Sequence, residues 1–207
     1  EKYVEGKLQG YPPGWKISEN APVVPHSTYG AAKAAIDALV QVRWKEAQTP
    51  VIALRQFNCV GERETHPYVI PEIISQLSRF SSGGSLSLGN NSFRDFQYAG
   101  DAVEMAVELL EKGQFGEVYN MGSEGGVKIY ELARMIFMLM CPEEKYGIQT
   151  LKIEQDPSRV RPWEIWHLQS DNSKLYSIIE TRPKVSLEDA LSRTITYFRE
   201  SGNTWGF

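Results

Sequence analysis

The sequence of 207 residues contains few of the features that mark membrane, nucleic-acid-binding or disulfide-rich proteins. No apolar run approaches the ~20 residues needed to cross a bilayer, and no signal-peptide pattern is present. The net charge is -4 without a basic block, which argues against nucleic acid or an anionic membrane as a partner. Cys59 and Cys141 have neither metal nor redox spacing, so we expect apolar cysteines in a reducing, cytoplasmic compartment.

Metal and dinucleotide signatures are equally scarce. His26, His66 and His167 are not spaced as metal ligands, and we expect no metal site. No glycine-rich turn has the spacing that binds a dinucleotide between a strand and a helix. The chain also begins at Glu1 without an initiator methionine. We therefore expect it to be the back portion of a longer protein.

What is present is an ordinary globular composition, 42% hydrophobic and 23% charged, sufficient for one large domain or parts of two. The hydrophobic periodicity predicts alternating helices and strands, and therefore an α/β fold. Asp101 and Asp171 are interpreted as helix caps, and Ser186 with Asp189 as a capping box. The expected helices span 27–47, 71–80, 101–112, 128–140 and 186–200, with a short one carrying Leu175 and Ile178. The expected strands span 51–57, 85–88, 93–98, 117–121 and 150–154, and 58–67 is an expected loop.

Tyr29 and Lys33 form the most informative pattern. They lie near the start of the predicted 27–47 helix, and their i, i+4 spacing places both side chains on one helical face. A free tyrosine titrates near ~10 and is a poor base at neutral pH, whereas an ammonium held beside a phenol favours the phenolate. The pair therefore predicts a proton-transfer site. The spacing is also common in ordinary helices, so a structural role stays open on this pattern alone.

Five segments in a fixed order carry a resemblance to a known family. They are 19–22 with 27–33, 54–63, 89 with 94–102, 118–123 with 131–133, and 161–162 with 171–174. In this order they resemble the C-terminal part of an extended short-chain dehydrogenase/reductase. The group is the NAD-dependent epimerase/dehydratase family, which acts on nucleotide sugars. Glu62 and Arg63 stand where many relatives have Pro-Arg, so the geometry of that turn is expected to differ.

The resemblance implies the C-terminal part of a Rossmann-type doubly wound parallel sheet plus a smaller α/β substrate-binding domain. Residues 1–62 would be the remainder of the dinucleotide-binding domain. Residues 63–207 would form mainly the substrate-binding domain, with about 93–122 returning to the Rossmann sheet. The family's glycine-rich fingerprint and catalytic Ser or Thr would lie upstream of Glu1.

The implied activity is epimerase or dehydratase chemistry on a nucleotide-diphosphate sugar, by transient oxidation at sugar C4 with NAD or NADP. We expect that activity of the intact protein, which would be a homodimer, and expect this chain alone to be inactive. An alternative stays open, in which the chain is a truncated, inactive product that binds nucleotide sugar or a partner subunit.

The resemblance also implies roles for eight residues. Tyr29 would accept the proton of the sugar 4-hydroxyl, and Lys33 would support it and hold the nicotinamide ribose. The other implied contacts are with the nicotinamide by Gln56 and Phe57, with the substrate by Asn58 and His66, and with the diphosphate by Arg94 and Arg161.

Ordinary alternatives stay open for several of these residues. Asn58 is also suited to a turn, and Arg94 to a solvated strand edge. Trp163 and Trp166, close to Arg161 in sequence, are candidates to stack a nucleobase, although packing in the interior is the expectation that we favour.

Overall fold

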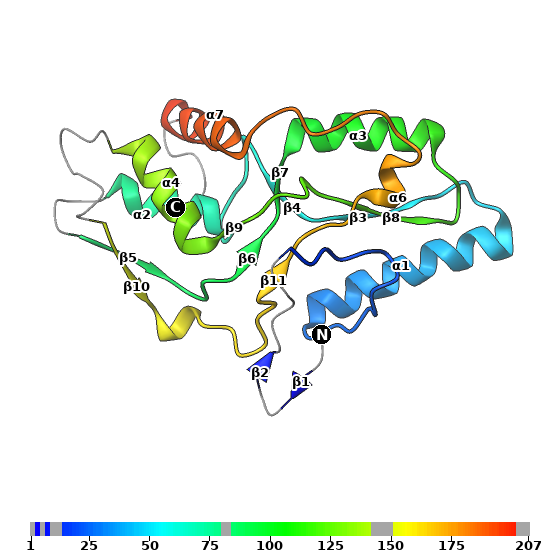
Figure 1. The fold of residues 1–207 in the computed structure, drawn as a ribbon, viewed down its shortest axis with the longest axis horizontal. Helices are drawn as coiled ribbons and strands as arrows, with labels where there is room; N and C mark the ends of the chain where they lie inside the picture. The colour runs from blue at the N-terminus through cyan, green and yellow to red at the C-terminus, as the bar shows by residue number, and fades with distance from the viewer. Residues whose placement is uncertain (1–2, 5–6, 9–13, 80–83, 142–150, 202–207) are drawn as a thin grey trace.

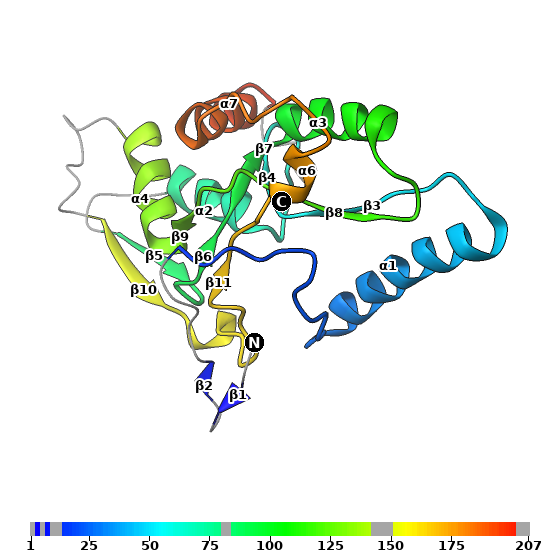
Figure 2. The same cartoon turned by 45° about the vertical axis from the view of Figure 1, so that its right-hand side comes forward.

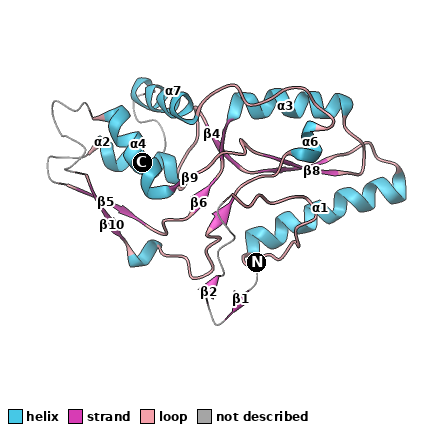
Figure 3. Cartoon of the chain, viewed as in Figure 1, coloured by secondary structure: helices cyan, strands magenta, loops and turns pink. Residues whose placement is uncertain are grey.

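The computed structural model describes residues 3–4, 7–8, 14–79, 84–141 and 151–201 (Figures 1 and 3). Helices and strands alternate along the chain, which confirms the α/β class. The helices are α1 (Thr28–Ala47), α2 (Val69–Ser78), α3 (Ala99–Lys112), α4 (Ile129–Met140), α6 (Ser173–Tyr176), α7 (Leu187–Glu200) and a 3-10 turn, η2 (Pro157–Arg159). The strands are β1 (Tyr3–Val4), β2 (Lys7–Leu8), β3 (Ala53–Gln56), β4 (Asn58–Val60), β5 (Ser85–Leu88), β6 (Phe93–Arg94), β7 (Phe96–Tyr98), β8 (Val118–Met121), β9 (Val127–Lys128), β10 (Lys152–Gln155) and β11 (His167–Leu168).

Parallel pairing dominates the sheets. β3 pairs with β8, β4 with β7, and β5 with β10, all in parallel. β6 lies between β11, to which it is parallel, and β9, to which it is antiparallel. Parallel neighbours cannot be joined by a tight hairpin, so the chain must cross over between them, and helices occupy these crossovers.

Two helices lie on opposite sides of the β3–β8 pair (Figures 1 and 2). On one side, α3 buries Met105 and Leu109 against Tyr119 and Met121 of β8. On the other side lies α1, in which no residue is buried. The helix forms where the sequence predicts it, because the Ser27 side chain accepts a hydrogen bond from the Gly30 amide at 3.0 Å.

The apolar face expected on α1 is present but is not covered by the described part of the chain. Ile36 and Leu39 are 53% and 58% exposed. Val40 and Trp44, on the same predicted face, are half-buried. No helix in the described residues is long and apolar enough to cross a membrane.

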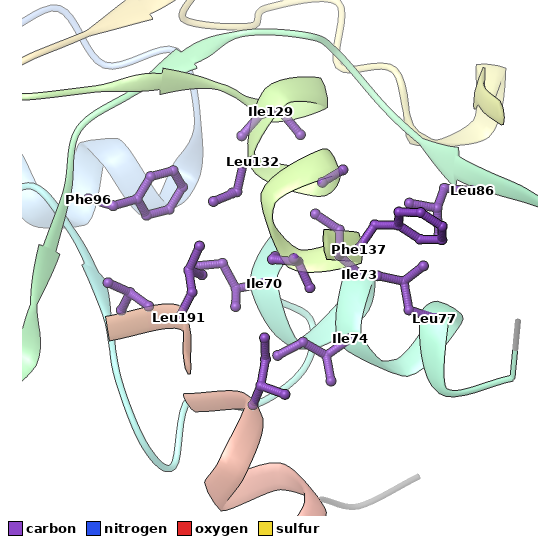
Figure 4. Close-up of a cluster of buried hydrophobic side chains, with 14 of the residues drawn as sticks. Ile70, Ile73, Ile74, Leu77, Leu86, Phe96, Ile129, Leu132, Phe137 and Leu191 are labelled. Carbon is purple, nitrogen blue, oxygen red and sulfur yellow. The ribbon is translucent and has the colours of Figure 1, made fainter. Parts of the chain in front are cut away.

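The larger core lies where α2, α4 and α7 meet beside β5 (Figure 4). Ile73 of α2, Leu132 of α4 and Leu191 of α7 are completely buried, and Leu86 of β5 closes one side. Each such side chain contributes about 1.5–3 kcal/mol on burial, so this cluster dominates the stability of that part of the molecule. It fixes the strands and loops that carry several of the candidate site residues.

Four predicted segments differ from the observed elements in their bounds. The expected strand 51–57 is β3 alone, and the expected loop 58–67 begins with β4. The expected strand 93–98 is divided into β6 and β7, because its two halves pair with different partners on either side of Asp95. The expected strand 150–154 appears as β10, while Thr150 and Phe80, at the edges of two predicted elements, lie outside the described residues.

Asp101 does not cap α3 as expected. The cap position belongs to Tyr98, and the buried Asp101 carboxylate accepts hydrogen bonds from the Lys184 and Val185 amides at 2.9 Å each. Asp101 therefore anchors the segment that leads into α7, a partner more than 80 residues away. The cap predicted for α7 is confirmed, since Ser186 accepts a hydrogen bond from the Asp189 amide.

Candidate functional site

Tyr29 and Lys33 lie together in the first two turns of α1. The Lys33 Nζ is 5.5 Å from the centroid of the Tyr29 ring, on the same side of the helix, as their spacing predicts. The Tyr29 side chain is 73% exposed, so its phenol is within reach of a ligand. A reachable phenol beside an ammonium is an arrangement able to exchange a proton with a bound hydroxyl group.

Polar contacts connect the start of α1 to the central strands. Arg55 of β3 forms an ion pair with Asp37 of α1, with 2.5 Å between Nη2 and Oδ2, and also donates to the Glu19 carbonyl at 3.1 Å. The Glu19 carboxylate accepts a hydrogen bond from the Asn120 amide of β8 at 2.7 Å. These contacts fix where α1, with Tyr29, lies relative to the ends of β3 and β8.

The predicted nicotinamide and substrate residues follow one another at the carboxyl end of β3. The side-chain amide of Gln56 donates to the Gln97 side chain at 3.1 Å and to the Met121 carbonyl at 3.3 Å. The Phe57 amide also donates to Met121, at 2.8 Å. Asn58 Oδ1 is buried and has no hydrogen-bond partner among the described residues. Such an atom is suited to a donor from a ligand or a water molecule.

The loop after β4 carries two unusual polar groups. Glu64 Oε2 is buried without a hydrogen-bond partner among the described residues, and burial raises the pKa of Glu64 to about 8. Burial, followed by the charges of Glu64 and Asp95, raises the pKa of Cys59 to about 11. His66 contacts Glu72, with 3.2 Å between Nδ1 and Oε2. The histidine expected to contact substrate is thus already engaged by a carboxylate of α2.

The two predicted diphosphate arginines lie on adjoining segments, because residues 89–95 run beside residues 159–168. Arg94 of β6 is largely buried, and its guanidinium binds the Glu164 carboxylate and donates to the Ile165 carbonyl at 2.6 Å. Arg161 is exposed, and its backbone amide donates to Asn90 Oδ1 at 2.9 Å. Arg161 is therefore open to an anion, whereas Arg94 holds a carboxylate of this chain.

Asp95 is a structural centre that the sequence reasoning missed. It is fully buried and accepts hydrogen bonds from the amide and hydroxyl groups of Ser123 and of Ser170, at 2.6 to 3.0 Å. A fifth bond comes from the Glu124 amide at 3.2 Å. It thereby joins the loop after β8 to the segment before α6, next to Arg94. The sequence did offer one signal: in the predicted strand 93–98, the acidic Asp95 alternates onto the same face as the apolar Phe93.

The two tryptophans near Arg161 are partly exposed. Trp163 is 59% exposed and Trp166 is 42% exposed. The Trp163 ring lies parallel to the His26 ring, with an angle of 4° and 6.5 Å between their centroids. His26 is three residues before Tyr29, so the 161–166 segment approaches the start of α1.

No group of three or more His, Cys, Asp or Glu side chains in the described ranges is placed to hold a metal ion. What the structure does bring together is a Tyr-x-x-x-Lys pair at the start of a helix, beside parallel strands. These features define a class, the short-chain dehydrogenase/reductase-like α/β proteins. The sequence profile of the family described as GDP-mannose 4,6 dehydratase matches residues 6–194. The chain belongs to this family of NAD-dependent epimerases and dehydratases.

Individual relatives agree with this assignment. The human dTDP-D-glucose 4,6-dehydratase is 28% identical over 190 residues, which are 92% of this chain and 53% of that protein. The structure of dTDP-glucose 4,6-dehydratase from Bacillus anthracis in complex with NAD matches with a TM-score of 0.78 at 22% identity, covering 92% of this chain and 58% of that one. UDP-glucuronic acid 4-epimerase from Bacillus cereus, in complex with UDP-glucuronic acid and NAD, gives 0.78 at 25% identity, covering 90% and 57%. The chain spans about half the length of the curated relatives it matches.

Proposed function

We propose that this chain is the C-terminal portion of a nucleotide-sugar epimerase or dehydratase that acts by transient oxidation at sugar C4 with NAD or NADP. The observation that carries the proposal is the Tyr29–Lys33 pair at the exposed start of α1, in a chain of this family. In this proposal residues 1–62 belong to the dinucleotide-binding domain. Residues 63–207 are mainly substrate-binding, with about 93–122 returning to the dinucleotide-binding sheet.

The proposed chemistry assigns the proton to Tyr29. Its exposed phenolic oxygen accepts the proton of the sugar 4-hydroxyl, and the Lys33 ammonium stabilises the negative charge that forms. The nicotinamide, when bound, accepts a hydride from C4 and afterwards returns it. Gln56 and Phe57 are suited to border the nicotinamide, because they follow the carboxyl end of a parallel strand, where such ligands bind. They fit only that end of the cofactor, since this sequence has no glycine-rich turn for the pyrophosphate.

The proposed substrate contacts come from the strand that follows Phe57, the loop after it, and the two segments that carry Arg94 and Arg161. The buried Oδ1 of Asn58 accepts a hydrogen bond from the substrate, and the exposed Arg161 binds its diphosphate. Arg94 joins Arg161 by exchanging the Glu164 carboxylate for a phosphate oxygen, because a guanidinium binds both in the same geometry. His66 makes a further substrate contact from the loop before α2.

The uncovered surface of α1 supports a second candidate. It has exposed apolar residues along much of its length, which suits a homodimer contact or the packing of further chain. A truncated product that binds nucleotide sugar or a partner subunit without turnover would present the same surface. An upstream reading frame that encodes a glycine-rich dinucleotide fingerprint would exclude this second candidate.

Tyr29→Phe tests the catalytic proposal. The assay follows turnover of UDP-, GDP- and dTDP-sugars by the protein encoded with its upstream sequence. We expect the substitution to lower kcat by about 10²–10⁴-fold, because it removes the proton acceptor without changing the ring. Tyr68→Phe, at a tyrosine outside the pair that is 62% exposed, is the matched control and should retain the rate. A Tyr29→Phe enzyme as fast as the unmodified protein would refute the mechanism.

A further inference from the structure

Trp163 is an exposed indole on an unusually well-fixed backbone. Two residues before it, the Arg161 amide is held by Asn90 at 2.9 Å. Three residues after it, the Trp166 carbonyl accepts a hydrogen bond from the Phe93 amide at 2.9 Å. The main chain on both sides of Trp163 is therefore tied to residues 90–93, while Trp163 itself is 59% exposed. A large rigid ring held in this way is suited to contact a ligand at low entropic cost.

The position of the ring indicates which ligand group it contacts. Trp163 lies parallel to His26, and His26 is directly before Ser27, the residue that caps α1 ahead of Tyr29. The exposed Arg161 is two residues before Trp163 along the chain. Trp163 thus belongs to the segment that carries the guanidinium proposed to bind the diphosphate, and through His26 it meets the start of the helix that carries the phenol proposed to act at sugar C4.

In a nucleotide-diphosphate sugar, the hexose carries the reacting carbon C4 and is joined directly to the diphosphate, and the nucleobase is at the far end. We propose that the indole of Trp163, with His26 beside it, packs against the C–H face of the hexose ring and selects the sugar. The inference rests on the proposed function and extends it, by assigning a sugar-specificity residue. An indole face has a negative quadrupole and attracts the weakly positive C–H groups of a pyranose.

The test measures affinity by calorimetry for pairs of ligands, each nucleoside diphosphate with and without its sugar, using UDP, GDP and dTDP. We expect Trp163→Ala to weaken nucleotide-sugar binding about tenfold while leaving nucleoside-diphosphate binding within about twofold. Trp163→Phe, which keeps an aromatic face, should recover part of the loss. Saturation-transfer NMR should show contact with the hexose ring protons in the unmodified protein and its loss in Trp163→Ala.

Val160→Ala is the control, because it shortens another exposed apolar side chain of the same segment. It should leave both affinities unchanged. Equal weakening of the sugar-free and sugar-bearing ligands by Trp163→Ala would place the nucleobase or diphosphate on Trp163 and overturn the inference, while the proposed function would stand. No change in either affinity would also overturn it. Failure of the unmodified protein to bind any of the nucleotide sugars would overturn both.

Discussion

Glu64 is a carboxyl group whose surroundings favour its neutral form. One of its oxygens is buried without a hydrogen-bond partner among the described residues, and burial raises its pKa to about 8. The Cys59 thiol lies close enough for its own pKa to respond to the Glu64 charge. The surroundings of this loop therefore disfavour a negative charge. The strand before it, β4, begins with Asn58, whose side-chain oxygen is buried.

The pKa of Glu64 predicts that stability falls as pH rises. In the unfolded chain the carboxyl loses its proton near ~4.3, whereas in the folded chain it keeps the proton up to about pH 8. Between these values the unfolded state binds fewer protons, so the free energy of unfolding decreases, by at most about 1.4 kcal/mol per pH unit. Glu64→Gln should remove this slope and raise the melting temperature most at pH 7 to 8.

Melting curves from pH 5 to 8 check this prediction. Glu62→Gln is the control, because Glu62 is exposed and accepts a hydrogen bond from the Tyr98 hydroxyl at 3.2 Å. Each variant leaves all other titratable groups of the chain in place, so the difference between them isolates Glu64. Parallel stability curves for the unmodified protein and Glu64→Gln would show that the carboxyl is not buried as described.

At the scale of single elements, the sequence predicted those helix bounds that depend on neighbouring residues alone. The bounds of α1 follow from the Ser27 cap and the helical period, and those of α7 from Ser186. The division of 93–98 was not predictable, because it depends on β6 and β7 pairing with strands far away in sequence. Asp101 had the pattern of a cap but binds amides more than 80 residues later.

The candidate site shows the same limit. Tyr29 and Lys33 were predictable as a pair because four residues of helix determine their geometry. The Glu164 carboxylate on Arg94 is 70 residues away, and no local pattern connects the two. The exposure of Trp163 likewise depends on which distant segments cover it, and the described chain leaves most of it open.

Gly116 lies in the turn before β8, where Trp44 near the end of α1 packs against it. Replacing this glycine should lower the stability of the protein. Its φ is +81°, its amide donates to the Val51 carbonyl at 2.7 Å, and a Cβ there would overlap the Trp44 ring of α1. We expect Gly116→Ala to lower the free energy of unfolding by about 2 kcal/mol or more, from backbone strain and overpacking together. Urea denaturation measures the loss.

Gly14→Ala separates the two causes. Gly14 also has a positive φ, +83°, but nothing lies within 4 Å of a Cβ added there. Its replacement carries the backbone cost alone, about 1 kcal/mol. Equal losses at both glycines would mean that Trp44 does not pack against Gly116.

At the scale of the whole molecule, the two faces of the central strands differ in how they are covered. α3 lies on one face and α1 on the other (Figure 2). α3 buries Met105 and Leu109, whereas α1 buries no residue. The exposed apolar side chains of α1 include Ile36, Leu39 and Val42, which recur at helical spacing. A contiguous apolar stripe of this kind on a protein surface usually marks a contact with another chain or domain.

This stripe predicts that the isolated chain self-associates through α1. Sedimentation velocity over a concentration series should show a dimer or larger species, since burying the stripe removes apolar surface from water. The double variant Ile36→Glu with Leu39→Glu should be monomeric and remain folded, because neither side chain is buried in the described chain. Met138→Glu, at a 53% exposed residue of α4, is the control and should leave the association unchanged. A monomeric unmodified chain, or dissociation by Met138→Glu instead, would show that α1 is not the contact surface.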